Sequence, residues 1–495
     1  MTLTLGVDIG TYETKGVLVD AHGRIVAEAK ARHEMIVPRP GWAEHRADED
    51  WWGDFQRVTQ AILAQDGVSA NDIAAVAVSA IGPCMLPVDA AGHPLMNGVL
   101  YGVDTRAMAE VEALTDQIGA ATILARCGNA LTSQSVGPKI LWLRRNHPEM
   151  FAKTAKILTS TSYLVHRLTD EYVIDHYTAA NFSPIYDVDR QDWCFDLAPD
   201  IAAPEQLPRL LWSSEIAGQI TETAAKATGL AVGTPVTAGT IDAAAEALSV
   251  GVRQSGDMMV MYGSTIFIIT LTETRLRDPR LWYAPWLFEG QHASMAGLAT
   301  SGTLTHWFRD NFARELPRDT AFPTLVEEAA SRPAGAEGLL FLPYFSGERT
   351  PLHDPHAKGA FFGLNLTHTR GHMFRAVLEG IAFGTGHVVE TYAAAGARPT
   401  RVLAVGGGVQ NEIWLQAMSD VCALPQDICA VTTGASYGDA FLARMALGQA
   451  ALQDIADWNP VIRHVSPQQV DALQRAYPLF RRLYEQTKDI AKELG

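Results

Sequence analysis

A carboxylate, a glycine turn and a cation lie close together near the start of the chain, between two β-rich segments. Asp8 ends the first segment, where it could hold a hydrated Mg²⁺ ion. Gly10 allows backbone N–H groups to approach an anion closely. Thr11, Thr14 and Lys15 offer two hydroxyl groups and an ammonium group to phosphate oxygens. This pattern predicts a phosphate-binding hairpin, although an ordinary hairpin with a polar turn would explain it equally well.

A second hairpin of the same kind follows about half the chain later. Gly263, Ser264 and Thr265 lie between two apolar segments, at the place that the glycine turn has in the first hairpin. Met261 stands where the first hairpin has Asp8. Two such hairpins facing each other would hold a polyphosphate from both sides, with the metal ligand on one side only.

Asp242 lies at the junction of a short strand and an alanine-rich helix, just before the second hairpin. The strand covers 235–239, and the helix is expected over 243–250. An acidic residue at this place caps a helix favourably, so a purely structural role stays open. Its position before the second phosphate hairpin makes Asp242 a candidate catalytic base.

The third expected strand, 73–79, ends in a flexible turn that contains Gly82 and Pro83. Strand ends of this kind carry ligands in α/β sheets. Asp104 and Arg106 follow on a later turn. A structural ion pair between these two residues and a contact with a substrate are both compatible with the sequence.

A strand at 401–405 ends in three glycines and is followed by a helix that begins near Asn411. A strand, a glycine turn and a helix N-terminus together form a seat for a nucleotide. Gly407 and Gly408 are the candidate contacts in this turn. The chain contains neither the GxGxxG pattern of dinucleotide folds nor a GxxxxGK[ST] P-loop.

Length and composition limit the classes of protein to consider. A chain of 495 residues is expected to form two domains of roughly 250 residues, which we place at 1–252 and 253–495. A net charge of −16 argues against nucleic-acid binding. No apolar run is long enough to span a membrane, and no signal for export is present. The five cysteines are scattered, which indicates reduced thiols in the cytoplasm.

The paired hairpins resemble those of the superfold that contains actin, hexokinase and the heat-shock ATPases. This resemblance implies an α/β fold of two ribonuclease H-like (actin-like ATPase) lobes with a central cleft. It also implies that each lobe offers one hairpin to the phosphates of ATP.

Within this superfold, the chain resembles the FGGY family of carbohydrate kinases over essentially its whole length. The most specific stretches are the first hairpin, Pro40 to His45 (PGWAEH), Gly347 to Pro351 (GERTP) with its continuation to Leu364, and the turn from Gly406 to Asn411. The GERTP stretch is similar to that of the xylulokinases in this family.

The resemblance implies a role for each matching position. Asp242 matches the catalytic aspartate that takes the proton from the sugar hydroxyl group. Asp8 matches the acid that is linked to the metal. The positions that match nucleotide contacts, together with those that the hairpin pattern adds, are Gly10, Thr11, Thr14, Lys15, Gly263, Ser264, Thr265, Gly407, Gly408 and Asn411.

Two sugar-reading positions depart from the family pattern. Gly82-Pro83 stands where xylulokinases have Met-His and glycerol kinases have Arg-Glu. Ala243 follows the catalytic aspartate, where these enzymes have Asn or Gln. Two polar contacts to the polyol are therefore missing, and such losses change substrate preference by orders of magnitude.

The sequence therefore predicts an ATP-dependent sugar kinase that uses ATP and Mg²⁺ and acts on a pentulose such as D-xylulose. The sugar is expected on the first lobe near Gly82, Pro83, Tyr101, Asp104 and Asp242, whose helix N-terminus should keep its carboxylate ionised. A kinase for ribulose, erythritol or glycerol, an ATPase switch similar to actin or a chaperone, and a sugar-sensing paralogue are the alternatives. A homodimer is left open as the assembly state.

Overall fold

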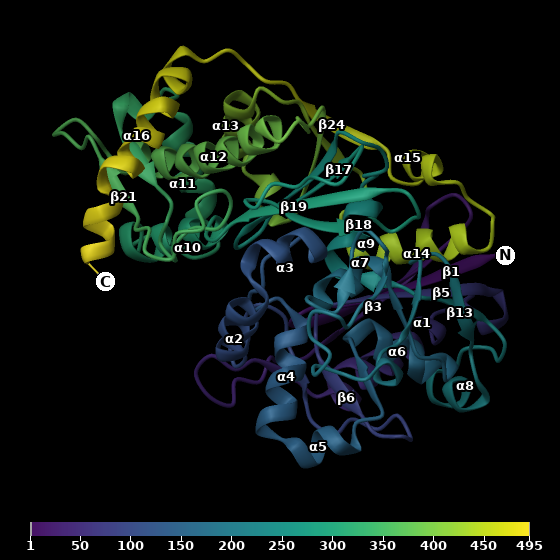
Figure 1. The fold of residues 1–495 in the computed structure, drawn as a ribbon. Coiled ribbons are helices and arrows are strands. Elements are labelled where there is room, and N and C mark those ends of the chain that lie inside the picture. Colours follow the sequence, from purple (N-terminus) through teal and green to yellow (C-terminus); the bar gives the residue numbers. More distant parts are fainter. Residues whose placement is uncertain (1, 495) are drawn as a thin grey trace. The chain divides into compact units, whose positions relative to one another are not determined.

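Residues 2–494 are described by a computed structural model, which groups the chain into two compact units (Figure 1). Unit 1 contains the residues up to Arg253 together with Tyr283–Ala293 and Thr433–Pro460. Unit 2 contains Gln254–Trp282, Ser294–Thr432 and the residues from Val461 onward. The sequence places one division after residue 252, and the compact units differ from it in that two later segments belong to unit 1.

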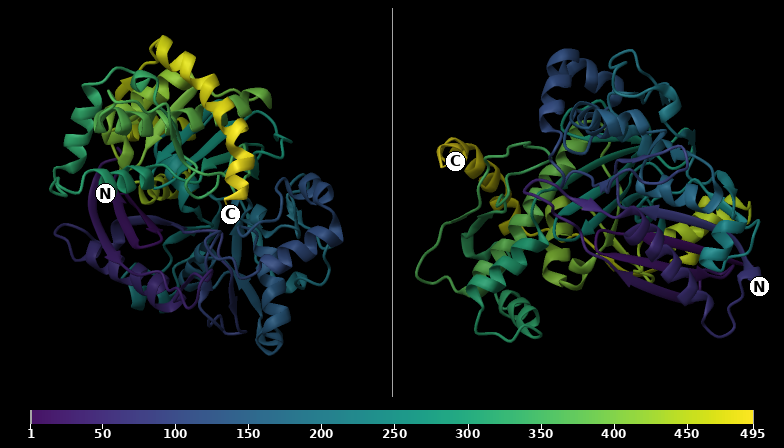
Figure 2. Two further views of the ribbon diagram at one scale, coloured as in Figure 1. Left: turned by 90° about the vertical axis from the view of Figure 1, so that its left-hand side faces the viewer. Right: turned by 90° about the horizontal axis from the view of Figure 1, so that it is seen from below.

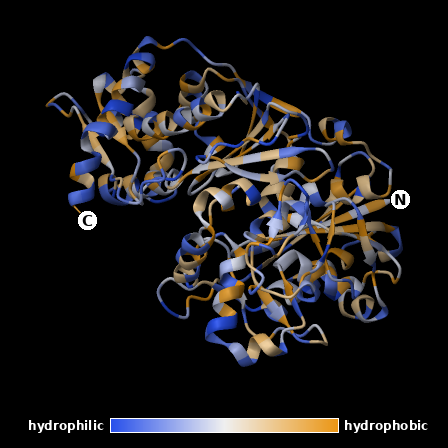
Figure 3. Cartoon of the chain, viewed as in Figure 1, coloured by the Kyte–Doolittle hydropathy of each residue, from blue (hydrophilic) through white to orange (hydrophobic). Residues whose placement is uncertain are grey.

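A seven-stranded sheet forms the centre of unit 1, in the order β13-β14-β5-β1-β2-β3, with β15 paired to β5. Its strands are β1 (Leu3–Ile9), β2 (Glu13–Val19), β3 (Ile25–Arg32), β5 (Ile73–Ala80), β13 (Ile216–Gln219), β14 (Pro235–Thr237) and β15 (Thr240–Ile241). β1 and β5 are parallel neighbours, and every residue of β1 is buried. Such strands, buried on both faces, are nearly continuous in hydrophobicity, as their orange colour in Figure 3 shows.

The remaining elements of unit 1 surround this sheet. The short strands are β4 (Glu44–His45), β6 (Leu86–Val88), β7 (Gly98–Val99), β8 (Lys156–Leu158), β9 (Val173–Asp175), β10 (Tyr186–Asp187), β11 (Asp192–Trp193) and β12 (Arg209–Leu211). The helices are α1 (Gly53–Leu63), α2 (Met108–Ile118), α3 (Ala120–Cys127), α4 (Val136–Asn146), α5 (Pro148–Lys153), α6 (Ser160–Thr169), α7 (His176–Ala179), α8 (Glu222–Thr228), α9 (Asp242–Ser249), α14 (Ala435–Ala446) and α15 (Ile455–Trp458).

Helix α14 returns to unit 1 because glycines let it lie directly on β1 and α9 (Figure 1). A Cβ atom added at Gly6 of β1 would lie 1.9 Å from the carbonyl oxygen of Ser436. A Cβ atom added at Gly438 would lie 1.9 Å from the carbonyl oxygen of Ala245. No larger residue fits either contact without moving the backbone. The late segment is therefore part of the first core, although it is far away in the sequence.

Unit 2 contains most of a second seven-stranded sheet, in the order β18-β19-β17-β16-β22-β23-β24, in which most residues of the edge strand β18 are assigned to unit 1. Its strands are β16 (Asp257–Tyr262), β17 (Ile266–Thr272), β18 (Trp282–Pro285), β19 (His292–Leu298), β22 (Arg401–Val405), β23 (Gln426–Cys429) and β24 (Val461–Val465), with the separate pair β20 (Leu340–Leu342) and β21 (Ala360–Phe362). Its helices are α10 (Gly302–Phe312), α11 (Ala321–Ala330), α12 (Arg370–Ala394), α13 (Glu412–Cys422) and α16 (Asp471–Glu493). The C-terminal helix α16, yellow in Figure 2, packs against α12 and α13.

Both predicted hairpins are confirmed. β1 and β2 pair antiparallel, with Asp8 opposite Lys15 and a turn over 10–13. β16 and β17 pair in the same way, with Tyr262 opposite Ile266. The second turn is one residue shorter than the first, although both begin at a glycine.

Candidate active site

Three strand ends meet at one edge of the first sheet. Asp8 on β1 and Thr240 on β15 are both paired with Ser79 of β5, one on each side. Since β1, β5 and β15 are parallel, their carboxyl ends point the same way. The turn that starts at Gly10 and the start of α9 at Asp242 therefore lie at the same edge, which is where α/β sheets bind ligands.

Four carboxyl groups interact electrostatically at this edge, and two of them were not predicted. Asp8 and Asp242 were candidates from the sequence, whereas Glu246 of α9 and Asp439 of α14 were not. Burial raises the pKa of Asp8 well above its ordinary value, and the charges of Asp242 and Asp439 raise it further. Lys15 acts in the opposite direction on Asp8 and Glu246. The cluster carries more negative charge than this one cation balances.

Ser79 links two of these carboxyl groups. Its hydroxyl group donates to Asp439 Oδ2 at 2.6 Å, and it lies 3.4 Å from Asp8 Oδ1. The other oxygen of Asp439 is buried and has no hydrogen-bond partner within residues 2–494. Burial raises the pKa of Asp439 well above its ordinary value, although the bonds from Ser79 act to lower it. Burial therefore favours the protonated form of Asp439 at the edge of the cluster.

Asp242 ionises most readily of the four. Burial raises its pKa to about 6, although the N–H group of Ala243 donates to its carboxylate at 2.7 Å and opposes the shift. Burial raises the pKa of Glu246 to about 7, with a further contribution from Asp242. The expected effect of the helix N-terminus on Asp242 is thus present but smaller than the effect of burial. At neutral pH, Asp242 is still mostly ionised and can accept a proton.

Replacing Asp439 by asparagine is expected to stabilise the protein at alkaline pH by about 1 kcal/mol or more, because the amide cannot ionise and a pKa difference of one corresponds to about 1.4 kcal/mol. A group whose pKa is raised in the folded state contributes stability below its unfolded pKa, and this contribution is lost as the pH rises. Thermal unfolding at pH 8 should therefore favour Asp439→Asn, and the difference should shrink as the pH falls toward 4. A variant that is less stable than the wild type at pH 8 would contradict the conclusion that burial opposes the ionisation of Asp439.

The predicted sugar-side residues lie near the cluster. A Cβ atom added at Gly82 would come within 2.9 Å of the side chain of Ile241, directly before Asp242. Pro83 is buried beside it. Burial raises the pKa of Tyr101, and the charge of Asp242 raises it further, while a hydrogen bond with Thr11 acts to lower it. The structure therefore brings Tyr101 and the Gly82–Pro83 turn to the edge that carries Asp242.

Asp104 is engaged in a structural ion pair, the alternative that the sequence left open. Its side chain is fully buried, and Arg106 donates to both of its oxygens, at 2.7 Å to Oδ2 and 2.9 Å to Oδ1. The N–H group of Ala43 donates to Oδ2 at 2.7 Å, and Arg106 also donates to Glu44 at 2.8 Å. Asp104 joins the PGWAEH stretch to the segment after Tyr101, and a direct contact with sugar stays a prediction.

Lys139 is a buried cation that sequence reasoning did not assign to the site. Its ammonium group donates to the carbonyl oxygens of Leu100, at 2.5 Å, and Tyr101, at 3.0 Å. Burial lowers its pKa to about 8. Lys139 therefore fixes the backbone that presents Tyr101.

The candidate nucleotide contacts of unit 2 also meet at one sheet edge. β16 and β22 are parallel, with Met261 paired to Val405, so the turn of Gly263, Ser264 and Thr265 lies beside the glycine turn. A Cβ atom added at Gly408 would clash with Tyr262 and Trp414, at 2.8 and 2.7 Å, whereas Gly407 faces open space. One glycine thus allows close packing and the other leaves room for a ligand.

Asn411 begins α13 as predicted, and its side chain is already engaged. Its Oδ1 atom accepts a hydrogen bond from the N–H group of Trp414 at 3.1 Å, so it caps the helix. The amide N–H₂ group of Asn411 stays available for a nucleotide.

The carboxylate cluster fits a hydrated Mg²⁺ ion better than a metal held by the protein alone. Within residues 2–494, no three His, Cys, Asp or Glu side chains are arranged to ligate a metal ion. Mg²⁺ keeps several water molecules and is commonly bound through one or two carboxylates and substrate phosphates. Asp8, beside the Gly10 turn and crowded by like charges, has the chemistry for such a contact.

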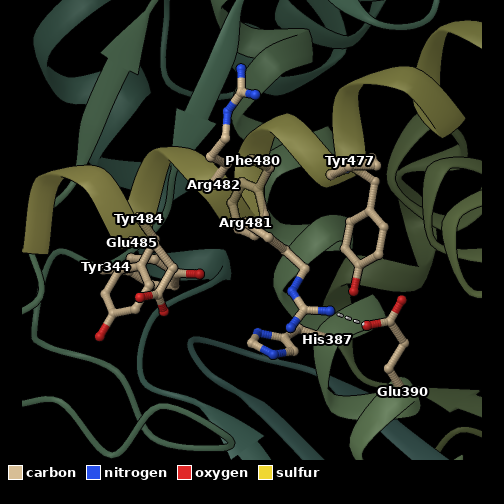
Figure 4. Close-up of a pocket in the computed structure, with 10 residues that line it drawn as sticks. Tyr344, His387, Glu390, Tyr477, Phe480, Arg481, Arg482, Tyr484 and Glu485 are labelled. Atoms are coloured by element: carbon tan, nitrogen blue, oxygen red, sulfur yellow. Dashed lines mark hydrogen bonds and ion pairs between the residues drawn. The ribbon is translucent and has the colours of Figure 1, made fainter.

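A hollow of about 420 Å³ in unit 2 lies away from all the predicted site residues of that unit (Figure 4). It lies between α12 and α16, where Arg481 pairs with Glu390 at 2.6 Å beside Tyr477 and His387. None of its lining residues belongs to the hairpin turn or to the glycine turn. The hollow therefore does not identify the reactive site.

Comparison with known proteins gives a consistent result over the whole chain. The profile of the FGGY family of carbohydrate kinases, N-terminal domain, matches residues 3–249, and that of its C-terminal domain matches residues 258–447. A xylulose kinase of Escherichia coli (strain K12) is 30% identical over 97% of this chain and 98% of its own length. The crystal structure of xylulose kinase from Rhodospirillum rubrum superposes with a TM-score of 0.93 at 31% identity, covering 99% of both chains. A gluconokinase of Bacillus subtilis (strain 168) is 28% identical over 84% of this chain and 82% of its own length.

Proposed function

Because the chain belongs to the FGGY family of carbohydrate kinases, we propose that it transfers the γ-phosphoryl group of ATP to a hydroxyl group of a ketopentose, with D-xylulose as the first choice. The fold is that of the actin-like ATPases, and the activity is that of a sugar kinase. The observation that carries the proposal is the position of Asp242. It is the most readily ionised carboxyl group of a buried cluster at a sheet edge that also carries a phosphate-type turn.

Asp242 would orient the sugar hydroxyl group and accept its proton as the bond to phosphorus forms. Phosphoryl transfer needs positioning and charge neutralisation more than covalent help from the protein. A base with a pKa near 6 is ionised at neutral pH and still accepts a proton late in the reaction. The raised pKa values of Asp8, Glu246 and Asp439 leave Asp242 as the suitable base among the four.

The phosphates of ATP would contact Gly10, Thr11 and Lys15 in unit 1. In unit 2, the proposed contacts are Gly263, Ser264, Thr265, Gly407, Gly408 and Asn411. Mg²⁺, bound through Asp8, would neutralise negative charge that develops on the phosphoryl group. Thr14 is fully buried and donates to Asp54 at 3.1 Å, so we propose that it supports the turn and does not touch phosphate.

A kinase for another polyol is the second candidate, and one observation favours it. Gly82, packed against Ile241, and Ala243 offer no polar side chain to a sugar hydroxyl group. A pocket that lacks these partners discriminates less sharply between ribulose, xylulose and smaller polyols. D-Xylulose remains first because the relatives at 28 to 31% identity include several named xylulose kinases.

A screen of sugar-dependent ADP release over ketoses, aldoses and alditols tests this function. We expect turnover with at least one ketopentose or small polyol, and less discrimination between them than a dedicated xylulokinase shows. If every sugar is inert while a protein partner stimulates ATP hydrolysis, the chain is an ATPase switch and the proposal is wrong. The screen needs an ATP-only control to separate hydrolysis from transfer.

We propose the cytoplasm as the site of action and a homodimer as the assembly to test by light scattering. None of the five cysteines forms a disulfide bond and all five are buried, which fits a reducing compartment. Within residues 2–494, no helix is both long and apolar enough to cross a membrane.

A further inference from the structure

Two histidines form hydrogen bonds with the backbone of the first phosphate-type turn. The Nε2 atom of His33 lies 3.0 Å from the carbonyl oxygen of Gly10. The Nε2 atom of His45 lies 3.1 Å from the carbonyl oxygen of Thr11. The two imidazole rings also contact each other edge to face, with centroids 4.9 Å apart. Each ring thus occupies one carbonyl group of the turn.

The other two carbonyl groups of this turn are occupied as well. Tyr12 O accepts from the backbone N–H group of His33 at 3.1 Å, and Glu13 O accepts from the N–H group of Gly10 at 3.0 Å. In contrast, the backbone N–H groups of Thr11 and Tyr12 have no partner in the described part of the chain. The turn therefore keeps its carbonyl oxygens engaged and its N–H groups available for an anion.

The proton on His45 can be assigned from its partners. Trp51 Nε1 can only donate, and it lies 3.1 Å from His45 Nδ1, so this nitrogen accepts. Nε2 must then carry the proton that is donated to Thr11 O. Burial lowers the pKa of His45 to about 4, and the neighbouring His33 lowers it further, so the ring stays neutral.

His33 faces acceptors on both sides. Its Nδ1 atom lies 2.7 Å from Asp54 Oδ2, and its Nε2 atom faces the carbonyl oxygen of Gly10. Asp54 also accepts from Thr14 at 3.1 Å and from Arg57. Burial alone would raise the pKa of Asp54, but the hydrogen bonds from His33 and Arg57 bring it below its ordinary value. Both ring nitrogens of His33 are therefore engaged, one by Asp54 and the other by the carbonyl oxygen of Gly10.

The carbonyl groups of the second turn, in unit 2, accept hydrogen bonds from backbone N–H groups instead of histidines. Gly263 O accepts from the N–H group of Gly302 at 3.0 Å, and Ser264 O accepts from the N–H groups of Ser301 and Thr303 at 3.0 and 3.2 Å. These donors belong to the first turn of α10 and the residue before it. The same outcome, engaged carbonyl oxygens in a glycine turn, thus arises twice from unrelated side chains and backbone groups.

We propose that His33 and His45 are positioning residues for phosphate binding, which keep the Gly10 and Thr11 carbonyl oxygens turned away from the nucleotide. This inference rests on the proposed function, since it takes the turn as the phosphate site. A phosphate oxygen is repelled by a carbonyl oxygen and attracted by an N–H group, so the orientation of each peptide decides the affinity.

The test compares binding of two probes to purified variants by calorimetry. The non-hydrolysable analogue AMP-PNP, with Mg²⁺, reports the phosphate contacts, and adenosine reports the base and ribose contacts alone. We expect His33→Leu and His45→Leu to weaken AMP-PNP by about 10- to 100-fold, the range for leaving a buried carbonyl group without its hydrogen-bond partner. The affinity of each variant for adenosine should stay within about threefold of the wild-type value, because adenosine has no phosphate to contact the turn. His93→Leu, at an exposed histidine, is the matched control.

A second pair of variants tests the hydrogen bond that holds the His33 ring in place. Asp54→Asn can accept from Arg57 with its oxygen and donate from its amide to His33 Nδ1, so His33 Nε2 can still donate to Gly10 O. We expect it to cost less than about threefold in AMP-PNP affinity, whereas Asp54→Leu should resemble His33→Leu.

Each result of these binding measurements supports or overturns the positioning role of the two histidines. Equal losses for adenosine and AMP-PNP, or no loss in folded His33→Leu and His45→Leu with normal thermal unfolding, would overturn the positioning role. If the wild type binds AMP-PNP as expected but no sugar supports ADP release, the proposed function fails while the inference about the turn stands. If the wild type binds adenosine and AMP-PNP equally, the turn is not a phosphate site and the inference fails.

Discussion

Replacing Asp242 by asparagine is expected to lower kcat for sugar phosphorylation by about 10²- to 10⁴-fold, the usual cost of removing a general base. Asparagine keeps the shape and can still accept from the N–H group of Ala243, so the start of α9 should not change. Burial raises the pKa of Asp242 to about 6, so wild-type activity should fall as the pH drops through this value and the base becomes protonated. The residual activity of the variant should not show this decrease at acidic pH.

Nucleotide affinity provides the control for Asp242→Asn, because the proposed ATP contacts lie on other residues. Glu222→Gln is the matched variant, since Glu222 is an exposed acid at the first position of α8 in the same unit. We expect this control to have wild-type kcat. Near-wild-type turnover in Asp242→Asn would mean that Asp242 only caps a helix, and the mechanism would be wrong.

Asp8→Asn is expected to lower kcat/KM for ATP by about 10²- to 10³-fold at limiting Mg²⁺, as for other losses of transition-state charge stabilisation. Burial and the charges of Asp242 and Asp439 favour the protonated form of Asp8, so Mg²⁺ binding competes with protonation of this carboxyl group. The apparent Mg²⁺ affinity of the wild type should therefore increase with pH. In Asp8→Asn this pH dependence should flatten, which steady-state titrations of Mg²⁺ at several pH values will measure.

Asp116→Asn, at an exposed position of α2, controls for the loss of one negative charge. Excess Mg²⁺ should restore part of the activity of Asp8→Asn but none of that of Asp242→Asn. If Asp8→Asn keeps the wild-type response to Mg²⁺, then Asp8 is not linked to the metal, and its raised pKa has only a structural meaning.

The sequence predicts the hairpins and the helix start at Asp242 well because these features are local. A buried strand that ends in a polar glycine turn has a strong pattern, and both turns begin at the expected glycines, Gly10 and Gly263. The start of a helix directly after a short strand is equally visible, and α9 begins at Asp242 itself. The glycine turn after β22 and the helix start at Asn411 are local features in the same way, and the structure contains both.

Asp439 could not be predicted, because its partners are far away in the sequence. Its hydrogen bond to Ser79 joins residues 360 positions apart. The only local signal is an acidic residue among small residues in α14, which is also typical of a solvated helix face. Tertiary packing through Gly6 and Gly438 decides that this acid is buried.

Side-chain pairing is the other limit of the sequence analysis. Asp104 and Arg106 are compatible with an ion pair or a sugar contact when only spacing is known. The structure adds Glu44 and Ala43 as further partners of this pair, and these come from the PGWAEH stretch. In the same way, His45 has a clear role only once Trp51 and Thr11 are seen on its two nitrogens.

The fate of the γ-phosphoryl group is the most direct test of the central claim, that Asp242 directs it onto a sugar. ³¹P NMR of the wild type with ATP, Mg²⁺ and D-xylulose, or the best substrate of the screen, should show a sugar phosphomonoester that grows in step with ADP. In Asp242→Asn, this signal should be nearly absent over the same time while nucleotide still binds. Formation of inorganic phosphate in step with ADP, with no ester in the wild type, would contradict the account.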